Sequence, residues 1–267
     1  MLYYSNAKIN LGLNIIEKRS DGFHNLESVF YPINVKDALE FIPSQNTNLT
    51  SSGIKIDCST NDNLIIKAYQ LLQKDFEIPN LSFHIHKNIP FGAGLGGGSA
   101  NAAYTISEIN KFYKLNMSEP EIINYTSRLG SDCSFFIKNK PLFADRKGDN
   151  FKNINLNLSE YYILLIHPGF GISTVEAYQK ITAKKPKKSI LEIINEPIEK
   201  WKSELINDFE TALFPQYPIL EELKNQLYSD GAVYASMSGS GSSIFGIFKN
   251  KPSNKNYLKY WNWVGKL

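Results

Sequence analysis

Every second residue from Ile9 to Ile15 is apolar. A period of two is typical of a β-strand, whose side chains alternate between two faces. Ser20 to Gly22 follows as a turn signal, and short apolar runs predict further strands over Val29–Ile33 and Ala38–Ile42. Strands joined by turns at the start of a chain argue against a dinucleotide-binding fold, in which a helix follows the first strand.

Helical and strand patterns alternate in the middle of the chain. Asn61 to Asn63 can cap a helix whose apolar face extends from Leu64 to Leu72. Apolar and polar residues alternate from Leu81 to His86, which predicts a strand with one buried face. After a cluster of glycines, the spacing of small and apolar residues predicts a helix from Ser99 to about Tyr113, and a capping box at Ser118 predicts the next one.

A polar, asparagine-rich stretch from Lys147 to Ser159 indicates a boundary. Beyond it, the pattern predicts strands over Tyr161–Ile166 and Ile244–Phe248 and helices over Thr174–Ile181 and Ile219–Tyr228. This order of elements indicates the α+β class with mixed or antiparallel sheets. We predict two lobes, an N-terminal one over residues 1–150 and a C-terminal one over residues 151–267.

Composition narrows the class of protein. Of the 267 residues, 42% are hydrophobic and 21% are charged, which is typical of a globular chain that buries a sizeable core. The net charge of +3 is too small to indicate nucleic acid as a partner. The basic run from Lys184 to Lys188 is interrupted by a proline and is typical of a solvated loop.

The cysteines and the apolar runs bear on location. Cys58 and Cys133 have no spacing that suits a metal site, which predicts no metal-binding cysteines and a reducing compartment. The first residues lack the charged and then apolar pattern of a signal peptide. No apolar run approaches the roughly 20 residues that span a bilayer. We therefore expect a cytoplasmic protein without a membrane partner, as a monomer or weak homodimer.

The glycine cluster from Gly92 to Gly98 is the most informative segment. Glycines remove the β-carbons that would keep a ligand away from the backbone. The helix predicted to follow directs its free N–H groups and its positive dipole end into the loop. A loop of this kind favours phosphate without needing a cationic side chain.

Three known phosphate-binding motifs and a flexible linker are alternative interpretations of this segment. A P-loop requires Gly-Lys-Ser/Thr, whereas Gly98 is followed by Ser99 and Ala100. The G-x-G-x-x-G spacing is present, but the preceding strand is half polar and no acidic residue ends a following strand, as ribose recognition requires. Protein-kinase signatures such as H-R-D and D-F-G are missing from the sequence. A flexible glycine linker stays open, although it fits poorly between a strand and a helix.

The segment from Pro90 to Ser99 resembles the P-x-x-x-G-L-G-[SG]-[SG]-S signature of the GHMP kinases, which include galactokinase and the homoserine, mevalonate and phosphomevalonate kinases. The resemblance implies a two-lobed fold, with a mixed sheet and helices in the N-terminal lobe and an α/β sandwich in the C-terminal lobe. It also implies that the loop and the following helix hold the phosphates of ATP, with Mg²⁺ bridging them. The implied nucleotide-binding residues are Pro90, Phe91, Gly92, Ala93, Gly94, Leu95, Gly96, Gly97, Gly98, Ser99 and Ala100, with Asn63 and Lys87 as further contacts.

Two more segments are similar to one branch of this family, whose acceptor is a cytidine diphosphate-linked polyol. Ala7 to Leu11, leading to Asp-Gly-Phe-His, resembles its first motif, and Gly130 to Phe136 resembles G-[AS]-D-V-P-F-F with Cys-Ser in place of Val-Pro. The resemblance implies that Asp132 accepts the proton of the attacking hydroxyl. It implies that Lys8 keeps Asp132 ionised and stabilises the transferring charge. Two alternatives stay open: Lys8 as a solvated edge lysine, and Asp132 as a helix cap.

The acceptor site follows from the same resemblance. Phe23 and His24 would bind the cytosine, Tyr178 would be a second stacking ring, and Asn10 would orient the polyol. Stacking of this kind contributes roughly 1–3 kcal/mol per base in nucleic-acid systems. The implied activity is ATP-dependent phosphorylation of a 2-hydroxyl in non-mevalonate isoprenoid precursor biosynthesis.

Two small segments complete the resemblance. Ser236 to Ser243 looks like the third motif, M-S-G-[ST]-G-S, and we expect it to pack near the phosphate loop, with a plain tight turn as the alternative. Asn207 to Glu210 is similar to the family's N-D-x-E segment. Two other functions stay open: a homoserine or mevalonate type of kinase, and a catalytically inactive binding protein of the same fold.

Overall fold

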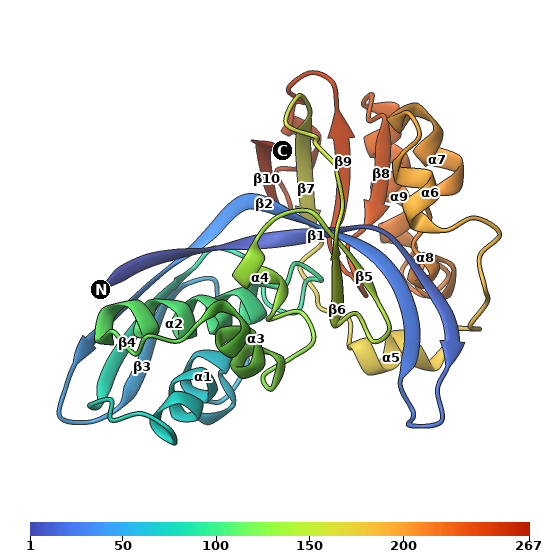
Figure 1. Ribbon diagram of the computed structural model, residues 1–267. Helices are drawn as coiled ribbons and strands as arrows, with labels where there is room; N and C mark the ends of the chain where they lie inside the picture. Colours follow the sequence, from blue (N-terminus) through green and yellow to red (C-terminus); the bar gives the residue numbers. More distant parts are fainter. The chain divides into compact units, whose positions relative to one another are not determined.

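The computed structural model describes residues 1–267 and contains strands β1 to β10 and helices α1 to α9 (Figure 1). The chain forms two compact units. Unit 1 comprises residues 1–7, 35–91 and 96–140, and unit 2 comprises residues 8–34, 92–95 and 141–267. Strands β1 (Leu2–Lys18) and β2 (His24–Pro43) pair with each other and contribute residues to both units.

The sheet of unit 1 joins the second half of β2 to β4 (Leu81–Lys87) and β3 (Asn48–Gly53). The β2–β4 pair is antiparallel and the β3–β4 pair is parallel, so this sheet is mixed, as predicted. Strand β4 follows the predicted alternation, because Phe83 and Ile85 point into the core while His86 is exposed.

Helices cover one face of this sheet. They are α1 (Leu64–Gln73), α2 (Gly97–Tyr113), α3 (Glu119–Ser127) and the short α4 (Phe135–Lys138) (Figure 1). The apolar side of α1 packs against the sheet residues and α2 in one buried cluster. Asn63 caps α1 by accepting from the backbone N–H of Ile65 at 2.9 Å, as its sequence position predicted.

Unit 2 is built on a four-stranded antiparallel sheet in the order β10-β7-β9-β8. Its strands are β7 (Tyr162–His167), β8 (Tyr234–Met237), β9 (Ile244–Phe248) and β10 (Trp261–Lys266). The first half of β2 also pairs with β5 (Leu142–Asp145), which pairs in turn with β6 (Asn150–Asn153).

The helices of unit 2 are α5 (Thr174–Gln179), α6 (Ile190–Ile194), α7 (Trp201–Glu204), α8 (Asp208–Leu213) and α9 (Pro218–Ser229). The apolar sides of α8 and α9 pack against the four-stranded sheet, with Phe209, Leu223 and Leu227 in the buried cluster. Single turns of 3₁₀-helix lie at Thr60–Asp62, Ile198–Lys200 and Lys255–Tyr257. The predicted α+β class is therefore confirmed.

The structure differs from the sequence predictions at several elements. The two strands expected at 29–33 and 38–42 form one continuous strand, β2. The C-terminal strand β10, on the edge of the four-stranded sheet, was not predicted. The polar strand β3 and helix α8 were not predicted. The limits of the two lobes, 1–150 and 151–267, stay predictions.

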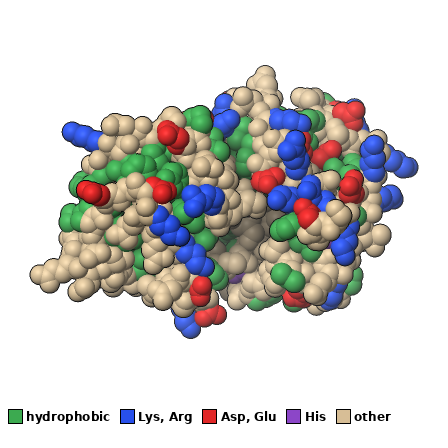
Figure 2. Space-filling view, turned by 60° about the horizontal axis from the view of Figure 1, so that its bottom comes forward, with side chains coloured by type: hydrophobic (Ala, Val, Ile, Leu, Met, Phe, Trp, Pro, Cys, Tyr) green, Lys and Arg blue, Asp and Glu red, His purple; other side chains and the backbone are tan.

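The surface carries charged side chains of both signs (Figure 2), as expected for a chain with a net charge of only +3. On the face seen in Figure 2, Lys and Arg side chains stand among Asp and Glu side chains. The absence of a nucleic-acid partner stays a prediction. Within residues 1–267, every helix is too short or too polar to cross a bilayer.

Candidate active site

Lys8 is buried on β1, with 3% of its surface exposed. Its ammonium group donates to Asn10 Oδ1 at 2.5 Å and to the backbone oxygen of Gly94 at 3.1 Å. It also lies 4.8 Å from the centre of the Phe30 ring. An ammonium group tolerates burial only when such partners replace water. The alternative of a solvated edge lysine is therefore wrong.

Asn10, two residues further on, is held equally firmly. Its Nδ2 donates to Ser28 Oγ at 2.8 Å, and the Ser28 hydroxyl donates to the backbone oxygen of Gly12 at 2.7 Å. The side-chain oxygen of Asn10 is thereby directed at Lys8. Ser28 was not singled out from the sequence, because its only signal is a small polar residue within a strand.

The glycine loop approaches β1 and a second loop through its backbone. In unit 2, the N–H of Lys8 donates to the oxygen of Leu95 at 3.0 Å. Gly94 has φ +76°, and a β-carbon there would lie only 2.0 Å from the oxygen of Ser238. The Ser238 hydroxyl donates to the Gly94 oxygen at 2.9 Å, and the N–H of Ser243 donates to the oxygen of Ala93 at 3.2 Å. The expected packing of the two small-residue loops is confirmed.

Helix α2 begins with backbone groups available for an anion. Its first flanking residue, Gly96, has φ +69° and makes no side-chain cap. The N–H groups of Gly97, Gly98 and Ser99 therefore face no side-chain acceptor at the positive end of the helix dipole. At the buried start of the helix, a β-carbon at Gly97 would lie 2.9 Å from Lys87 Nζ, so a larger residue would require that side chain to shift. This helix terminus fits the phosphate groups of a nucleotide.

Lys87 lies beneath this helix start in a buried ion pair with Asp37. The two carboxylate oxygens of Asp37 also accept from the N–H groups of Asn88 and Ile89, both at 2.8 Å, and from Asn101 Nδ2 at 2.9 Å. Burial lowers the pKa of Lys87, and the Asp37 carboxylate opposes that shift. Direct contacts of Lys87 and Asn63 with a nucleotide stay predictions. The same holds for contacts of Pro90 and Phe91.

Asp132 lies half-buried between α3 and α4 and accepts from the Ser131 hydroxyl at 3.2 Å. Helix α4 starts at Phe135, and its cap residue Ser134 makes no side-chain cap bond, so the alternative that Asp132 caps a helix stays open. The neighbouring Cys133 is buried, and burial raises the pKa of its thiol to about 12. That thiol is inert at neutral pH. The convergence of Lys8 with Asp132 stays a prediction.

The structure brings two of the predicted acceptor residues together. The rings of His24 and Tyr178 stack with centroids 4.8 Å apart and planes at 21°. Tyr178 packs edge-on against Phe209, with centroids 5.0 Å apart. Burial, followed by the nearby Lys18 charge, lowers the pKa of His24, so its ring is neutral near pH 7. Phe23 is 58% exposed, and Lys147 Nζ lies 5.0 Å from its ring centre.

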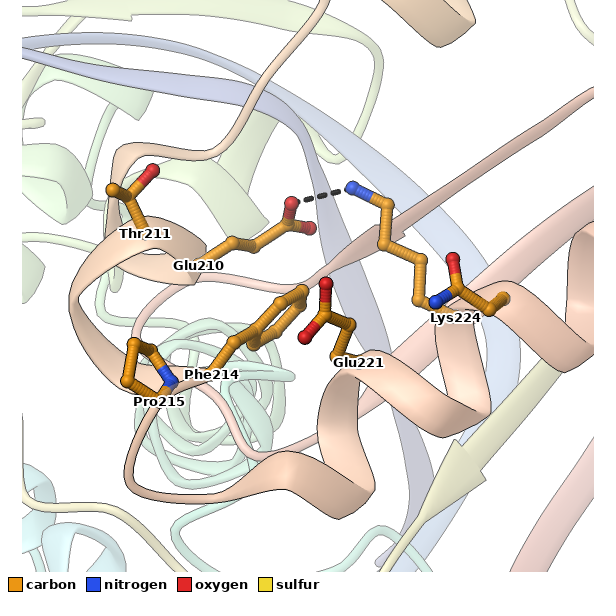
Figure 3. A pocket seen from close by; sticks show the side chains of 7 residues that line it. Glu210, Thr211, Phe214, Pro215, Glu221 and Lys224 are labelled. Carbon is orange, nitrogen blue, oxygen red and sulfur yellow. Dashed lines mark hydrogen bonds and ion pairs between the residues drawn. The ribbon is translucent and has the colours of Figure 1, made fainter.

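A separate pocket of about 400 Å³ lies in unit 2 (Figure 3). It contains none of the residues predicted for the nucleotide or the acceptor. Across it, Lys224 of α9 points to Glu210 of α8 (Figure 3). The residues that line it are Glu210, Thr211, Phe214, Pro215, Glu221, Lys224 and Asn225.

Known proteins resemble this chain over almost its whole length. Residues 63–140 match the GHMP kinases N terminal domain, and residues 190–264 match GHMP kinases C terminal. A 4-diphosphocytidyl-2-C-methyl-D-erythritol kinase of Parabacteroides distasonis is 48% identical over 95% of this chain and 93% of its own. A kinase of the same name from Bacteroides thetaiotaomicron is 49% identical over 93% of this chain and 92% of its own. The crystal structure of a 4-(cytidine 5'-diphospho)-2C-methyl-D-erythritol kinase matches this structure with a TM-score of 0.83 and 25% sequence identity. The match covers 99% of this chain and 98% of that one.

Proposed function

The chain belongs to the GHMP kinase family, and from this premise we propose that it transfers phosphate from ATP to the 2-hydroxyl of 4-diphosphocytidyl-2-C-methyl-D-erythritol. The observation that carries the proposal is the 48% identity, over 95% of the chain, to a kinase named for that acceptor. The reaction belongs to non-mevalonate isoprenoid precursor biosynthesis. A cytoplasmic location and a monomer or weak homodimer remain predictions.

The nucleotide side of the reaction depends on backbone groups. When bound, ATP would supply the phosphoryl group, and Mg²⁺ would neutralise the negative charge of its phosphates. The uncapped N–H groups of Gly97, Gly98 and Ser99 supply donors for these oxygens. Because glycines line the loop, the backbone comes close to the phosphates.

The acceptor hydroxyl loses its proton as it attacks. Asp132 takes this proton as the general base. Lys8 stabilises the negative charge on the transferring group, and the buried contacts with Asn10 and Gly94 hold its ammonium group in one orientation. Positioning and charge neutralisation are the main contributions of a protein to phosphoryl transfer.

The residues proposed to bind the cytidine part of the acceptor determine which acceptor the protein selects. Tyr178 contributes aromatic surface that suits stacking on a flat base, and the neutral imidazole of His24, stacked on Tyr178, offers one donor and one acceptor for the base edge. Phe23 adds an exposed aromatic surface beside Lys147, whose charge suits a diphosphate.

An acceptor-specificity assay tests the proposal. Purified protein is given ATP and Mg²⁺ with 4-diphosphocytidyl-2-C-methyl-D-erythritol, mevalonate or homoserine, and ADP release is measured. Turnover with the cytidyl acceptor alone is expected. Turnover with mevalonate or homoserine instead would refute the choice of acceptor.

Two substitutions test the assigned roles. Asp132→Asn and Lys8→Met should each lower kcat by at least roughly 100-fold, because each removes a group that acts on the reacting atoms. Lys111→Met, at an exposed lysine paired with Glu108, serves as the control and should keep normal turnover. Circular dichroism confirms that each variant is folded. Near-normal turnover of either site variant would remove the corresponding role.

A further inference from the structure

Asn207 is buried at the start of α8, with 2% of its surface exposed, and uses both ends of its amide. Its oxygen caps the helix by accepting from the N–H of Phe209 at 3.0 Å. Its Nδ2 donates to the backbone oxygens of Met237 and Gly239, both at 2.8 Å. The cap is a common helix feature, whereas the two donated bonds hold a separate loop.

Glu210, one turn along α8, binds the same loop at residues 236 and 237. Its Oε1 accepts from the N–H of Met237 at 2.7 Å and from the Ser236 hydroxyl at 2.9 Å. Its other oxygen accepts from Lys224 Nζ at 2.5 Å across the pocket (Figure 3). Glu210 is only 7% exposed, and its buried charge is balanced by one lysine, one backbone N–H and one hydroxyl.

The loop that these two residues hold leads directly to Lys8. Ser238 receives a bond from the N–H of Asn10 at 3.3 Å and donates to the oxygen of Gly94 at 2.9 Å. That same oxygen of Gly94 accepts from Lys8 Nζ at 3.1 Å. A displacement of Ser238 therefore moves the acceptor that orients the ammonium group.

Backbone geometry alone does not fix this loop. Gly239 has φ +57° and Gly241 has φ +86°, a region that glycine enters and leaves freely. A loop of serines and glycines keeps one conformation only when outside groups bind it. The amide of Asn207 and the carboxylate of Glu210 are such groups.

We propose that Asn207 and Glu210 are positioning residues of the kinase reaction, which hold residues 236–239 so that Ser238 and Gly94 orient Lys8. The proposal rests on the proposed function, because Lys8 has its catalytic role only there. It assigns a role to Asn207 and Glu210, which the sequence showed only to be similar to the family's N-D-x-E segment.

Asn207→Ser is the test variant. Serine is also a preferred helix cap, so it keeps the bond to Phe209 while it removes both donated bonds to the loop. Ser189→Ala is the matched control, because Ser189 caps α6 of the same unit by accepting from the N–H of Glu192 at 3.2 Å. Asn207→Asp, which has the same size and cap but no donor, replaces the serine variant if that variant does not fold.

Two measurements separate a positioning role from a structural one. We expect Asn207→Ser to lower kcat by at least about 10-fold, since a misplacement of about 1 Å is able to cost 100-fold in rate. The KM values for ATP and for the acceptor should stay within about threefold of the wild type, because the binding groups are intact. Amide hydrogen exchange should accelerate in peptides covering 236–243, and Ser189→Ala should change neither kcat nor this exchange.

Failure of this inference can be distinguished from failure of the proposed function. Unchanged loop exchange in a folded Asn207 variant overturns the inference, whatever the enzyme does. Faster exchange with unchanged kcat also overturns it, because the loop then does not orient Lys8. If the wild type fails to phosphorylate the cytidyl acceptor, the proposed function fails, and the exchange data still decide whether Asn207 holds the loop.

Discussion

Replacing Gly94 by alanine tests how closely the two small-residue loops must approach. Gly94 adopts φ +76°, which lies in the left-handed region. A β-carbon there would lie 2.0 Å from the Ser238 oxygen and 3.0 Å from the Gly241 oxygen. Both atoms belong to backbone, so no side-chain rotation relieves the overlap.

The cost has two parts. Placing a non-glycine residue in the left-handed region costs about 1–2 kcal/mol. A carbon and an oxygen normally approach to about 3.3 Å, so one of the two loops must move by roughly 1 Å. Overpacking of this kind costs about 1–3 kcal/mol more. We expect Gly94→Ala to lower the free energy of unfolding by about 2–5 kcal/mol. We also expect kcat to fall by up to about 100-fold, because the moved loop carries the acceptor for Lys8.

Gly92→Ala provides a matched control in the same loop. Gly92 has φ +64°, but a β-carbon there would meet only the α-carbon of Gly171, at 3.9 Å. This variant should show the conformational cost of about 1–2 kcal/mol without the overlap. Urea unfolding and steady-state kinetics of both variants measure the difference. Equal stability and equal kcat of the two variants would refute the close-approach argument.

Three further predictions concern other parts of the molecule. Asp37→Asn should lower the free energy of unfolding by about 3–5 kcal/mol in urea titrations, because it leaves the buried ammonium of Lys87 without a counter-charge; a loss below about 1 kcal/mol would contradict this. Tyr178→Ala should raise the acceptor KM by roughly 5–150-fold, as expected for loss of one stacking ring, while the KM for ATP stays unchanged; a change in the ATP KM instead would place Tyr178 elsewhere. Burial lowers the pKa of His167 to about 4, so the unfolded chain binds its proton first and stability should fall as the pH drops from about 6.5 toward 4. The slope from this group is at most about 1.4 kcal/mol per pH unit, and His167→Gln should flatten the stability profile measured between pH 7 and 5; an unchanged profile would show that His167 does not contribute.

The sequence predicted features that depend on neighbouring residues. The glycine loop, helix α2 and the cap of α1 were found because turn, cap and periodicity signals lie within a few residues of one another. Strand β2 was divided in two because Asn34 and Lys36 look like a polar break. In the structure both side chains are exposed while Val35 and Asp37 are buried, so the alternation continues through the polar stretch.

Features that depend on distant partners could not be predicted in this way. The buried Asp37 is stabilised by Lys87, 50 residues away, and no local pattern reveals such a pair. Strand β3 is polar and mostly exposed, so only its pairing with β4 defines it. For Asn207, the sequence showed a motif, whereas the direction of its amide toward residues 237 and 239 required the tertiary structure.

The interleaving of the two units has a consequence for how the chain is made. The chain passes between the units after residues 7, 34, 91, 95 and 140. On the ribosome, the last segment of unit 1 is complete at residue 140, whereas residues 8–34 must wait for residues 141–267 before unit 2 can close. Some contacts of the strand that carries Lys8, such as the bond from the N–H of Asn10 to the Ser238 hydroxyl, therefore wait for residues translated late, and such distant pairings slow folding. A single cut anywhere in the polypeptide, including one near residue 150, cannot release both units whole.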